Sequence, residues 1–443
     1  MKIIMTLSNI QIVRNCLFDK QLDILRNLAY SEMVLICNEA TFNSVKEHVS
    51  SYSVSDQLKI RILLFNASGE RFITLRILDS IAKSHVSSKF ALNKIFRAKS
   101  KNEITWAKLF LKVLVYVLTF KNRFSSHLFR FFYSKLYLYL EDFRRLQEFK
   151  DYDLALTLSL TDNLDTYIAG FCKKNNIKHI GTVRSWDNLT SHGLLRIKPD
   201  VFYCHSQAMQ EDLIKFQYFN RFNDTIVVGH SYWINFTRIK DIVPKSKPIK
   251  FKVLFGSMGL YFNPSEVALL AHIYQLRRKF LSTQVHFTVL MHPKFRLPVE
   301  VQNEFSDFIN FETFNFDNLT EVKSYSEYLE YLSKFNLILS SGSTLLLDAS
   351  LVNHNIAHIN FELSSVRYWE SIKRYLDFRE YYKQFIDLGQ ILIINSIEEF
   401  EKFILSAVSS KTSRAPNYRI AWKYILGEPS DTSLVDLVNK EIC

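Results

Sequence analysis

Glycine and proline are scarce in this sequence, with 10 and 8 residues among 443. An all-β protein with many tight turns needs both residues in larger numbers, so that class is disfavoured. Cysteine is scarce as well, and the five cysteines are scattered without a Cys-x-x-Cys pair. This pattern argues against a disulfide framework or a zinc site, and it predicts reduced, buried thiols in a cytoplasmic protein.

Long apolar runs are also missing. The longest, residues 109–120, is interrupted by Lys112. A membrane-spanning helix needs about 20 predominantly apolar residues. The N-terminal sequence MKIIMTLSNIQIV is typical of a short strand and lacks the continuous apolar region of a signal peptide. We therefore expect a chain that does not cross a membrane.

Acidic residues are nearly absent from residues 89–139, which contain eleven Lys and Arg but only one acidic residue, Glu103. The net charge of this segment is +10, and that of the whole chain is +12. Aromatic residues are interleaved with these cations. Such a segment suits an anionic membrane surface, where each cation contributes about 1 kcal/mol. Nucleic acid attracts the same charge, and an insertion with buried aromatics and solvated cations is a third explanation. We favour the membrane surface and expect no nucleic-acid partner.

Short apolar runs alternate with helical patterns along most of the chain, which predicts parallel sheets with crossover helices. The expected strands of the first half are Lys2–Leu7, Met33–Cys37, Ile60–Phe65, Leu154–Leu158, His179–Val183, Asp200–Tyr203 and Thr225–Val228. Those of the second half are Phe251–Phe255, His286–Met291, Phe308–Phe311, Leu337–Leu339, Ile356–Phe361 and Ile391–Ile394.

A polar stretch at residues 239–250, with Pro244 and Pro248, is the predicted linker between two doubly wound units. Residues 1–240 form the predicted N-terminal Rossmann-like domain, with a basic aromatic helical insertion near 81–150. Residues 250–443 form the predicted C-terminal Rossmann-like domain. Ligands of such sheets bind outside the carboxyl ends of the strands, so we expect the active site in a cleft between the two domains.

Two motifs follow strands of the second domain. His292-Pro293-Lys294 comes directly after the strand that ends at Met291. Proline ends the strand, and the imidazole and the ammonium can donate hydrogen bonds to a phosphate. The second motif, Ser340 to Thr344, separates a buried strand from a helix expected at Ser343–Leu351. Its hydroxyls and the backbone N–H groups of a helix start can bind an anion, and Gly342 permits close backbone approach.

Together these motifs resemble the His-Pro and Ser-Ser/Thr motifs of bacterial sialyltransferases and capsule-type transferases with the GT-B fold. Glycerophosphotransferases that use CDP-glycerol are similar in this respect. The resemblance implies two Rossmann-like domains facing a central cleft and a CMP-activated donor. Gly256-Ser257 matches the glycine-containing loop of these enzymes and is no GxGxxG fingerprint. The implied donor-binding residues are Gly256, Ser257, His292, Pro293, Lys294, Ser341, Gly342, Ser343 and Thr344.

A third motif, residues 182–193, follows a strand of the first domain and resembles the SWDNLT-type loop of surface-polysaccharide transferases. We predict Asp187 as the catalytic base, with Asp162, Asp165 and Glu39 as weaker candidates. The acidic-acidic-Gly motif that supplies the base in sialyltransferase families is missing. The predicted acceptor-binding residues are Arg184, Trp186, Asn188, Thr190 and His192.

The serine-rich turn lacks the Glu-x7-Glu pair of retaining transferases, and no Asp-x-Asp metal motif follows a strand. We therefore predict an inverting reaction without metal or cofactor, with His292 stabilising the leaving nucleotide. The expected protein transfers sugar from a nucleotide donor, a CMP-sugar acid being favoured. The acceptor is a lipid-linked or growing bacterial surface glycan such as capsule, lipopolysaccharide or O-antigen, at the cytoplasmic face of the inner membrane. The alternatives are a UDP-sugar 2-epimerase of the same fold and a non-catalytic scaffold in polysaccharide assembly.

Overall fold

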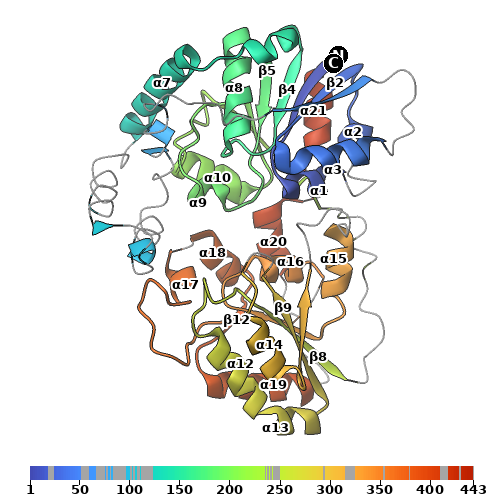
Figure 1. The fold of residues 1–443 in the computed structure, drawn as a ribbon, viewed down its shortest axis with the longest axis vertical. Coiled ribbons are helices and arrows are strands. Elements are labelled where there is room, and N and C mark those ends of the chain that lie inside the picture. Colours follow the sequence, from blue (N-terminus) through green and yellow to red (C-terminus); the bar gives the residue numbers. More distant parts are fainter. Residues whose placement is uncertain are drawn as a thin grey trace. The chain divides into compact units, whose positions relative to one another are not determined.

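The computed structural model describes most of the chain, and Figure 1 labels its helices and strands. The described ranges are 1–17, 24–50, 59–65, 123–234, 250–292, 295–314, 325–352, 355–378, 380–409, 418–428 and 431–442, with residues 75, 78–79, 81–82, 96–99, 102, 105–106, 110, 236, 239 and 242.

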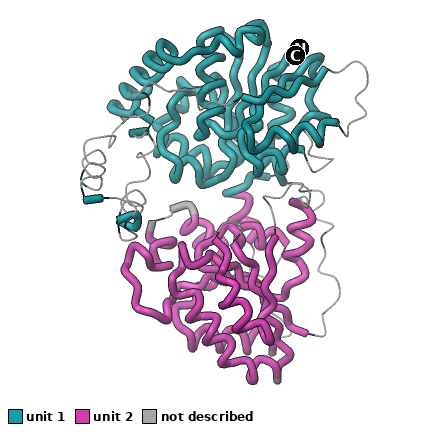
Figure 2. Tube along the Cα trace, in the orientation of Figure 1, with its two compact units in different colours: residues 1–234, 424–443 teal, residues 235–423 magenta. Residues whose placement is uncertain are grey.

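The chain forms two compact units, coloured separately in Figure 2. Unit 1 contains residues 1–234 and 424–443, and unit 2 contains residues 235–423. The last twenty residues thus belong to unit 1, whereas the sequence places them in the second domain. Gly229 pairs with Thr432, and the Ser231 N–H donates to the Leu426 carbonyl at 2.7 Å. The predicted linker at 239–250 lies outside the described residues except for 239, 242 and 250.

Unit 1 is built on a seven-stranded sheet of order β3-β2-β1-β4-β5-β6-β7, in which all neighbours are parallel. The strands are β1 (Lys2–Leu7), β2 (Glu32–Cys37), β3 (Lys59–Leu64), β4 (Leu154–Thr157), β5 (Lys178–Gly181), β6 (Val201–Cys204) and β7 (Thr225–Val228). β1 and β4 are buried over almost their whole length, as expected of central parallel strands covered on both faces. The chain direction across the sheet reverses between β1 and β4, which defines the switch point of this unit.

The helices of unit 1 whose bounds the structure describes pack around this sheet. They are α1 (Ile10–Leu17), α2 (Ile24–Asn27), α3 (Glu39–Ser50), α7 (Arg123–Leu140), the 3-10 helix η1 (Arg144–Phe149), α8 (Asn163–Asn175), α9 (Asn188–Ser191), α10 (Gln207–Lys215) and α21 (Leu434–Ile442). α7 and η1 lie within the predicted helical insertion, and 32 of its residues between 83 and 122 fall outside the described residues. Tyr133 and Tyr137 of α7 are fully buried in the core, and Gly170 lets α8 approach because a Cβ there would lie 2.9 Å from Tyr137.

Unit 2 repeats the architecture with a six-stranded parallel sheet of order β10-β9-β8-β11-β12-β13. Its strands are β8 (Phe251–Gly256), β9 (Val285–Met291), β10 (Ile309–Thr313), β11 (Leu337–Ser340), β12 (Ile356–Ile359) and β13 (Leu392–Ile394). Its helices are α12 (Glu266–Gln275), α13 (Arg277–Ser282), α14 (Val299–Phe305), α15 (Tyr325–Leu332), α16 (Leu345–Ser350), α17 (Arg374–Phe378), α18 (Glu380–Leu388) and α19 (Ile397–Ser409), and α20 (Arg419–Leu426) leads back to unit 1. The switch point lies between β8 and β11.

The prediction of an α/β protein with two doubly wound Rossmann-like domains is confirmed by these two strand orders. Among the described helices, none combines the length and the apolar character that crossing a bilayer requires.

Candidate functional site

The carboxyl edge of the unit 2 sheet carries the predicted donor-binding residues. Gly256, the last residue of β8, pairs with Ser340 of β11 on one side and with Leu290 of β9 on the other. The Ser257 N–H continues this ladder with a 2.9 Å hydrogen bond to the Leu290 carbonyl. The loops that follow β8, β9 and β11 therefore leave the sheet side by side. His292 follows β9 and Ser341 follows β11, and these strands are two strand spacings apart, roughly 10 Å. Pro293 and Lys294 of the same predicted set lie outside the described residues.

His292 is held in one orientation by the loop that follows it. The Phe295 N–H donates to His292 Nδ1 at 3.3 Å, and the half-buried ring packs between Phe262 and Phe295. A ring that accepts at Nδ1 carries its proton on Nε2 when it is neutral. His292 is thereby set up as an Nε2–H donor, which is the group that a phosphate oxygen requires.

The serine-rich turn divides its hydroxyls between core and solvent. The Ser341 side chain is fully buried, and its Oγ has no hydrogen-bond partner among the described residues. Ser343 is half-buried and accepts a 3.1 Å hydrogen bond from the Leu345 N–H, whereas Thr344 is exposed. Of these three hydroxyls, only those of Ser343 and Thr344 reach solvent. α16 begins at Leu345, two residues later than expected, and Thr344 at its N-cap makes no side-chain capping bond.

The two glycines of this edge are needed for packing. A Cβ at Gly256 would lie 2.2 Å from the Leu345 side chain, so α16 sits directly on the end of β8. Gly342 has a φ of +118°, and a Cβ there would lie 2.6 Å from Tyr375 Cγ. The space beside Gly342 is filled by the Tyr375 ring, so the close approach that this glycine permits is to a side chain of the protein itself.

Glu266, at the first residue of α12, is a buried carboxyl that the sequence analysis missed. Its Oε2 accepts a 3.1 Å hydrogen bond from the Met258 N–H, which fixes the loop after β8. Burial raises the pKa of Glu266 to about 7, against the opposing hydrogen bonds from Ser257 and the loop backbone. An acidic residue in the first turn of a helix is ordinary in a sequence, so no signal distinguished this one.

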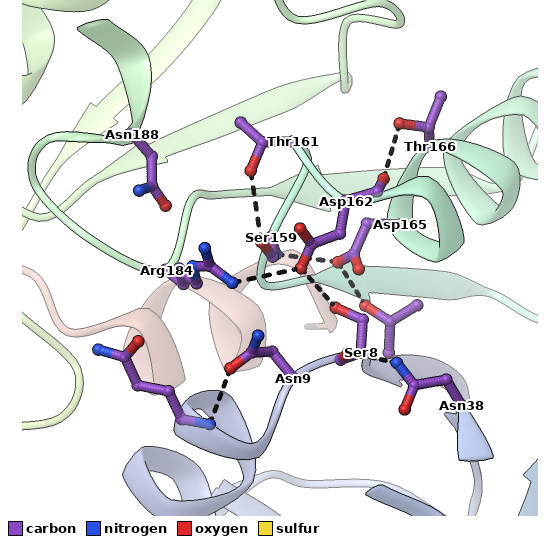
Figure 3. A network of polar contacts seen from close by, with 12 residues as sticks. Ser8, Asn9, Asn38, Ser159, Thr161, Asp162, Asp165, Thr166, Arg184 and Asn188 are labelled. Carbon is purple, nitrogen blue, oxygen red and sulfur yellow. Dashed lines mark hydrogen bonds and ion pairs between the residues drawn. The ribbon is translucent and has the colours of Figure 1, made fainter. Parts of the chain in front are cut away.

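The carboxyl edge of the unit 1 sheet carries a second cluster of polar residues, shown in Figure 3. Asp165, near the start of α8, accepts a 2.7 Å hydrogen bond from the Thr6 hydroxyl and a 2.9 Å bond from the Ser159 N–H. Asp165 is fully buried, and burial followed by the charge of Asp162 raises its pKa to about 6, although nearby hydroxyls oppose this. The carboxyl therefore joins the two strands at the switch point.

Asp162 lies on the solvent side of Asp165 and connects two loops (Figure 3). Its Oδ2 accepts a 3.3 Å hydrogen bond from the Ser8 hydroxyl and lies 3.9 Å from Arg184 Nη1. The Asn38 side chain in turn donates to the Ser8 carbonyl at 2.5 Å. Sequence reasoning ranked Asp162 low and overlooked Ser8, because only the pairing of β1 with β4 brings them together.

The predicted acceptor loop lies at this same edge. Asp187 is the N-cap residue of α9, and its carboxylate accepts hydrogen bonds from Asn188 Nδ2 at 3.3 Å and from Ser191 Oγ at 3.4 Å. Trp186, Asn188 and Thr190 are buried, and His192 is exposed. Arg184 and Asn188 point to the region of the Asp162 cluster in Figure 3. The catalytic and acceptor-binding roles of these residues stay predictions.

Within the ranges that the structure describes, no group of three or more His, Cys, Asp or Glu side chains could hold a metal ion.

No family model matches the sequence, and no curated protein does. Among solved structures the chain is similar to a glycosyltransferase from Rickettsia africae, with 10% identity, a TM-score of 0.48, and coverage of 100% of this chain and 96% of that one. It is also similar to a co-structure of MnaA with UDP from S. aureus, with 10% identity, a TM-score of 0.47, and coverage of 100% and 94%. A UDP-GlcNAc 2-epimerase from Neisseria meningitidis bound to UDP-GlcNAc is similar at 12% identity, with a TM-score of 0.45 and coverage of 100% and 98%. The assignment of two Rossmann-like domains rests on the strand orders given above.

Proposed function

We propose that the protein is a glycosyltransferase that binds a nucleotide-activated sugar at the carboxyl edge of the unit 2 sheet. The observation that supports this most is the register of β8, which places the loops after β8, β9 and β11 side by side at a switch point. Ligands of doubly wound sheets bind at that position. The loops supply an imidazole N–H and two solvent-facing hydroxyls, which suit the phosphate and ribose oxygens of a nucleotide.

The donor is a CMP-activated sugar acid in this proposal, following the resemblance of the His-Pro and serine-rich motifs to CMP-dependent transferases. His292 and Lys294 donate to the phosphate, and Ser343 and Thr344 bind its oxygens or the ribose. Negative charge develops on the phosphate as the bond to the anomeric carbon breaks. Donors already aimed at those oxygens stabilise the transition state more than the ground state, and this difference is what accelerates the reaction.

The acceptor binds at the carboxyl edge of unit 1, near Arg184, Asn188 and His192. Asp187 removes the proton of the acceptor hydroxyl, the resulting oxygen attacks the anomeric carbon, and the nucleotide leaves with the bonding electron pair. One displacement of this kind inverts the anomeric configuration, and no residue of the chain becomes covalently modified. Asp187 accepts hydrogen bonds from neutral groups, Asn188 and Ser191, whereas Asp162 already faces the Arg184 cation.

A lipid-linked or growing surface glycan, such as capsule, lipopolysaccharide or O-antigen, is the proposed acceptor, at the cytoplasmic face of the inner membrane. The exposed aromatic side chains of α7 support this. Phe124, Phe132 and Tyr139 are 76%, 61% and 84% exposed, on a helix that also carries Lys135. Aromatic and basic side chains on one helix favour an anionic lipid interface.

The test is a thermal-shift screen with CMP-, UDP-, GDP- and dTDP-sugars on the wild type, His292→Ala and the control Lys402→Ala, an exposed cation of α19. A ligand at 100 times its dissociation constant adds about 2.7 kcal/mol of stability. We expect stabilisation by the CMP-sugar in the wild type and the control, and its loss in His292→Ala. Stabilisation by every sugar nucleotide equally, or by none, contradicts the proposal.

Product analysis with the stabilising donor separates the alternatives. Sugar transferred to a glycan acceptor supports the transferase. Conversion of a UDP-sugar into its C2 epimer identifies the epimerase instead. Binding of a donor with neither reaction, and full glycan production by Asp187→Ala and His292→Ala in the cell, identifies the scaffold.

A further inference from the structure

Unit 1 has a half-open cavity of about 310 Å³ beside α7. Its lining residue Arg196 reaches the Asp162 loop, because the guanidinium donates to the Thr161 and Asp162 carbonyls at 3.0 and 3.2 Å. One face of α7, the end of α8 and the segment before β6 form its wall. Its basic lining residues are His127, Arg130, Lys135, Lys173, Arg196 and Lys198. None of the described lining residues is acidic. The spacing of His127, Arg130 and Ser134 along α7 places them on the same side of the helix.

Of the five Lys and Arg residues in this lining, two form ion pairs with carboxylates and three do not. Arg196 pairs with Asp79 at 2.9 Å, and Lys198 pairs with Asp224 at 2.7 Å. The other three are Arg130, Lys135 and Lys173. No carboxylate oxygen of the described residues lies within 4.0 Å of their side-chain nitrogens. Asp224 and Asp200 act on Arg130 and Lys173 only at longer range, so the lining of the cavity carries more positive than negative charge.

Arg130 is the buried member of this set, with 5% of its surface exposed. Its Nε donates to the Leu195 carbonyl at 2.8 Å and its Nη2 to Gln217 Oε1 at 3.2 Å. Gln217 is itself fixed by the backbone, because its Oε1 also accepts from the Leu195 N–H at 2.8 Å. Nη1 has no hydrogen-bond partner in the described structure. A buried guanidinium N–H without an acceptor is costly, and an anion that reaches hydrogen-bond distance of Nη1 would remove that cost.

Lys135 and Lys173 are exposed and lie at the rim of the cavity. Partial desolvation lowers the pKa of Lys173, Asp200 opposes this, and the charge of Lys135 lowers it further. The two ammonium groups are thus close enough to repel each other. An anion between them turns that repulsion into attraction.

We propose that this cavity binds a phosphate ester, with Arg130 as the buried anchor and Lys135 and Lys173 closing over it from the rim. A phosphate group has several strong acceptor oxygens, and a guanidinium matches their geometry. The volume is at the small end of ligand pockets, which span about 300–1,000 Å³, and fits a phosphate with a glycerol or a single sugar. The inference deepens the membrane attachment of the proposed function and does not depend on sugar transfer.

Two sources could supply that phosphate ester: a phospholipid headgroup or a soluble sugar phosphate. Phe131 lines the cavity and is 57% exposed, and further exposed aromatic residues follow along α7. Acyl chains can contact these rings while the headgroup phosphate enters the cavity. The arrangement favours the headgroup.

The experiment measures binding of inorganic phosphate and of glycerol 1-phosphate by calorimetry, and flotation with phosphatidylglycerol and phosphatidylcholine vesicles. The variants are Arg130→Gln and the double variant Lys135→Glu with Lys173→Glu. Lys46→Glu, an exposed cation of α3, is the control for charge reversal. We expect affinity for glycerol 1-phosphate to fall about tenfold or more in both test variants, and not in the control. The double variant changes exposed side chains, so it remains informative if Arg130→Gln does not fold.

Flotation with phosphatidylglycerol that is lost in the double variant assigns the headgroup as ligand. If the protein binds phosphate but does not float with any vesicles, the cavity is still a phosphate site, and its ligand is a soluble sugar phosphate. Absence of phosphate binding in the wild type, or equal affinity in the double variant and in Lys46→Glu, overturns the proposal. Nucleotide-sugar thermal shifts on the same variants are expected to stay unchanged, so failure of this site and failure of the proposed function are separable.

Discussion

The Thr6 hydroxyl at the end of β1 donates a 2.7 Å hydrogen bond to the Asp165 carboxyl, 159 residues further along the chain. Both residues are buried, and the bond crosses the point where the order of the sheet reverses. The Ser159 N–H donates to the same carboxyl oxygen, so one side chain holds the ends of two neighbouring strands together. A carboxyl in this position connects the stability of unit 1 to pH.

Asp165→Asn is expected to make unit 1 less sensitive to pH. The pKa of Asp165 is raised from 3.8 to about 6 in the folded protein. The folded state then binds the proton more tightly than the unfolded state, so stability from this group is present below pH 4 and is lost as pH rises through 6. The loss amounts to about 3 kcal/mol at most. Urea unfolding at pH 4.5 and 7.5 measures it.

The asparagine keeps the shape of the side chain and cannot ionise. We expect Asp165→Asn to gain stability relative to the wild type between pH 4.5 and 7.5. Asp151→Asn, which changes an exposed carboxyl, serves as control. An equal pH dependence in the wild type and in Asp165→Asn would show that this carboxyl does not titrate in the range.

Gly342→Ala is expected to destabilise unit 2 by about 1–3 kcal/mol. The backbone at Gly342 has a φ of +118°, and the added Cβ would press on Tyr375. Thr344→Ala is the matched control, because Thr344 is exposed and makes no side-chain capping bond. Thermal unfolding of the two variants measures the difference, and equal melting temperatures would refute the steric argument.

Substitution by alanine is expected to affect donor affinity differently at the two serines of this turn, Ser341 and Ser343. Ser343 reaches solvent, so Ser343→Ala is expected to weaken donor binding about fivefold, the loss of one hydrogen bond. The Ser341 hydroxyl is enclosed and has no partner in the described structure, so Ser341→Ala is expected to leave donor affinity and stability nearly unchanged. Titration with the stabilising nucleotide sugar compares them. A greater loss in Ser341→Ala than in Ser343→Ala would mean that the turn rearranges on binding.

Arg196 and Asp79 form a buried ion pair at 2.9 Å, and the Tyr133 hydroxyl also donates to Asp79. Arg196→Met leaves the Asp79 charge buried without its cation and is expected to cost about 3–5 kcal/mol. Changing both residues, Arg196→Met with Asp79→Asn, is expected to recover part of that loss. The double-mutant cycle in urea measures the coupling, and additive effects would indicate that the pair contributes nothing beyond its separate contacts.

Local patterns in the sequence were sufficient to predict the strands. Runs such as Lys2–Leu7 and Phe251–Phe255 are apolar on both faces, and only a central parallel strand buries both. His292 could be located at a strand end because proline follows it. The pairing partners that give residues their environment are remote, however. The burial of Asp165 depends on Thr6, and the orientation of Arg130 depends on Gln217, 87 residues away.

The first residues of the helices and the boundary at residue 424 were harder to predict, because they too depend on tertiary contacts. Serine and threonine between Ser340 and Thr344 each suit an N-cap, so hydrophobic pattern alone could not show that α16 begins at Leu345. The C-terminal helix α21 has an apolar face that could pack on the sheet of either unit, so its sequence alone did not show that it belongs to unit 1. Its contacts to unit 1, such as the 3.0 Å ion pair between Glu441 and Lys178, are set by tertiary structure and leave no trace in the local sequence.

The return of residues 424–443 to unit 1 makes unit 2 an insertion within unit 1. Protein domains usually fold in the order in which they are synthesised. Here the ribosome makes the first seven strands early, yet the helix that finishes their unit emerges only after all of unit 2. Unit 1 is begun first and yet can be completed only after unit 2 has been synthesised.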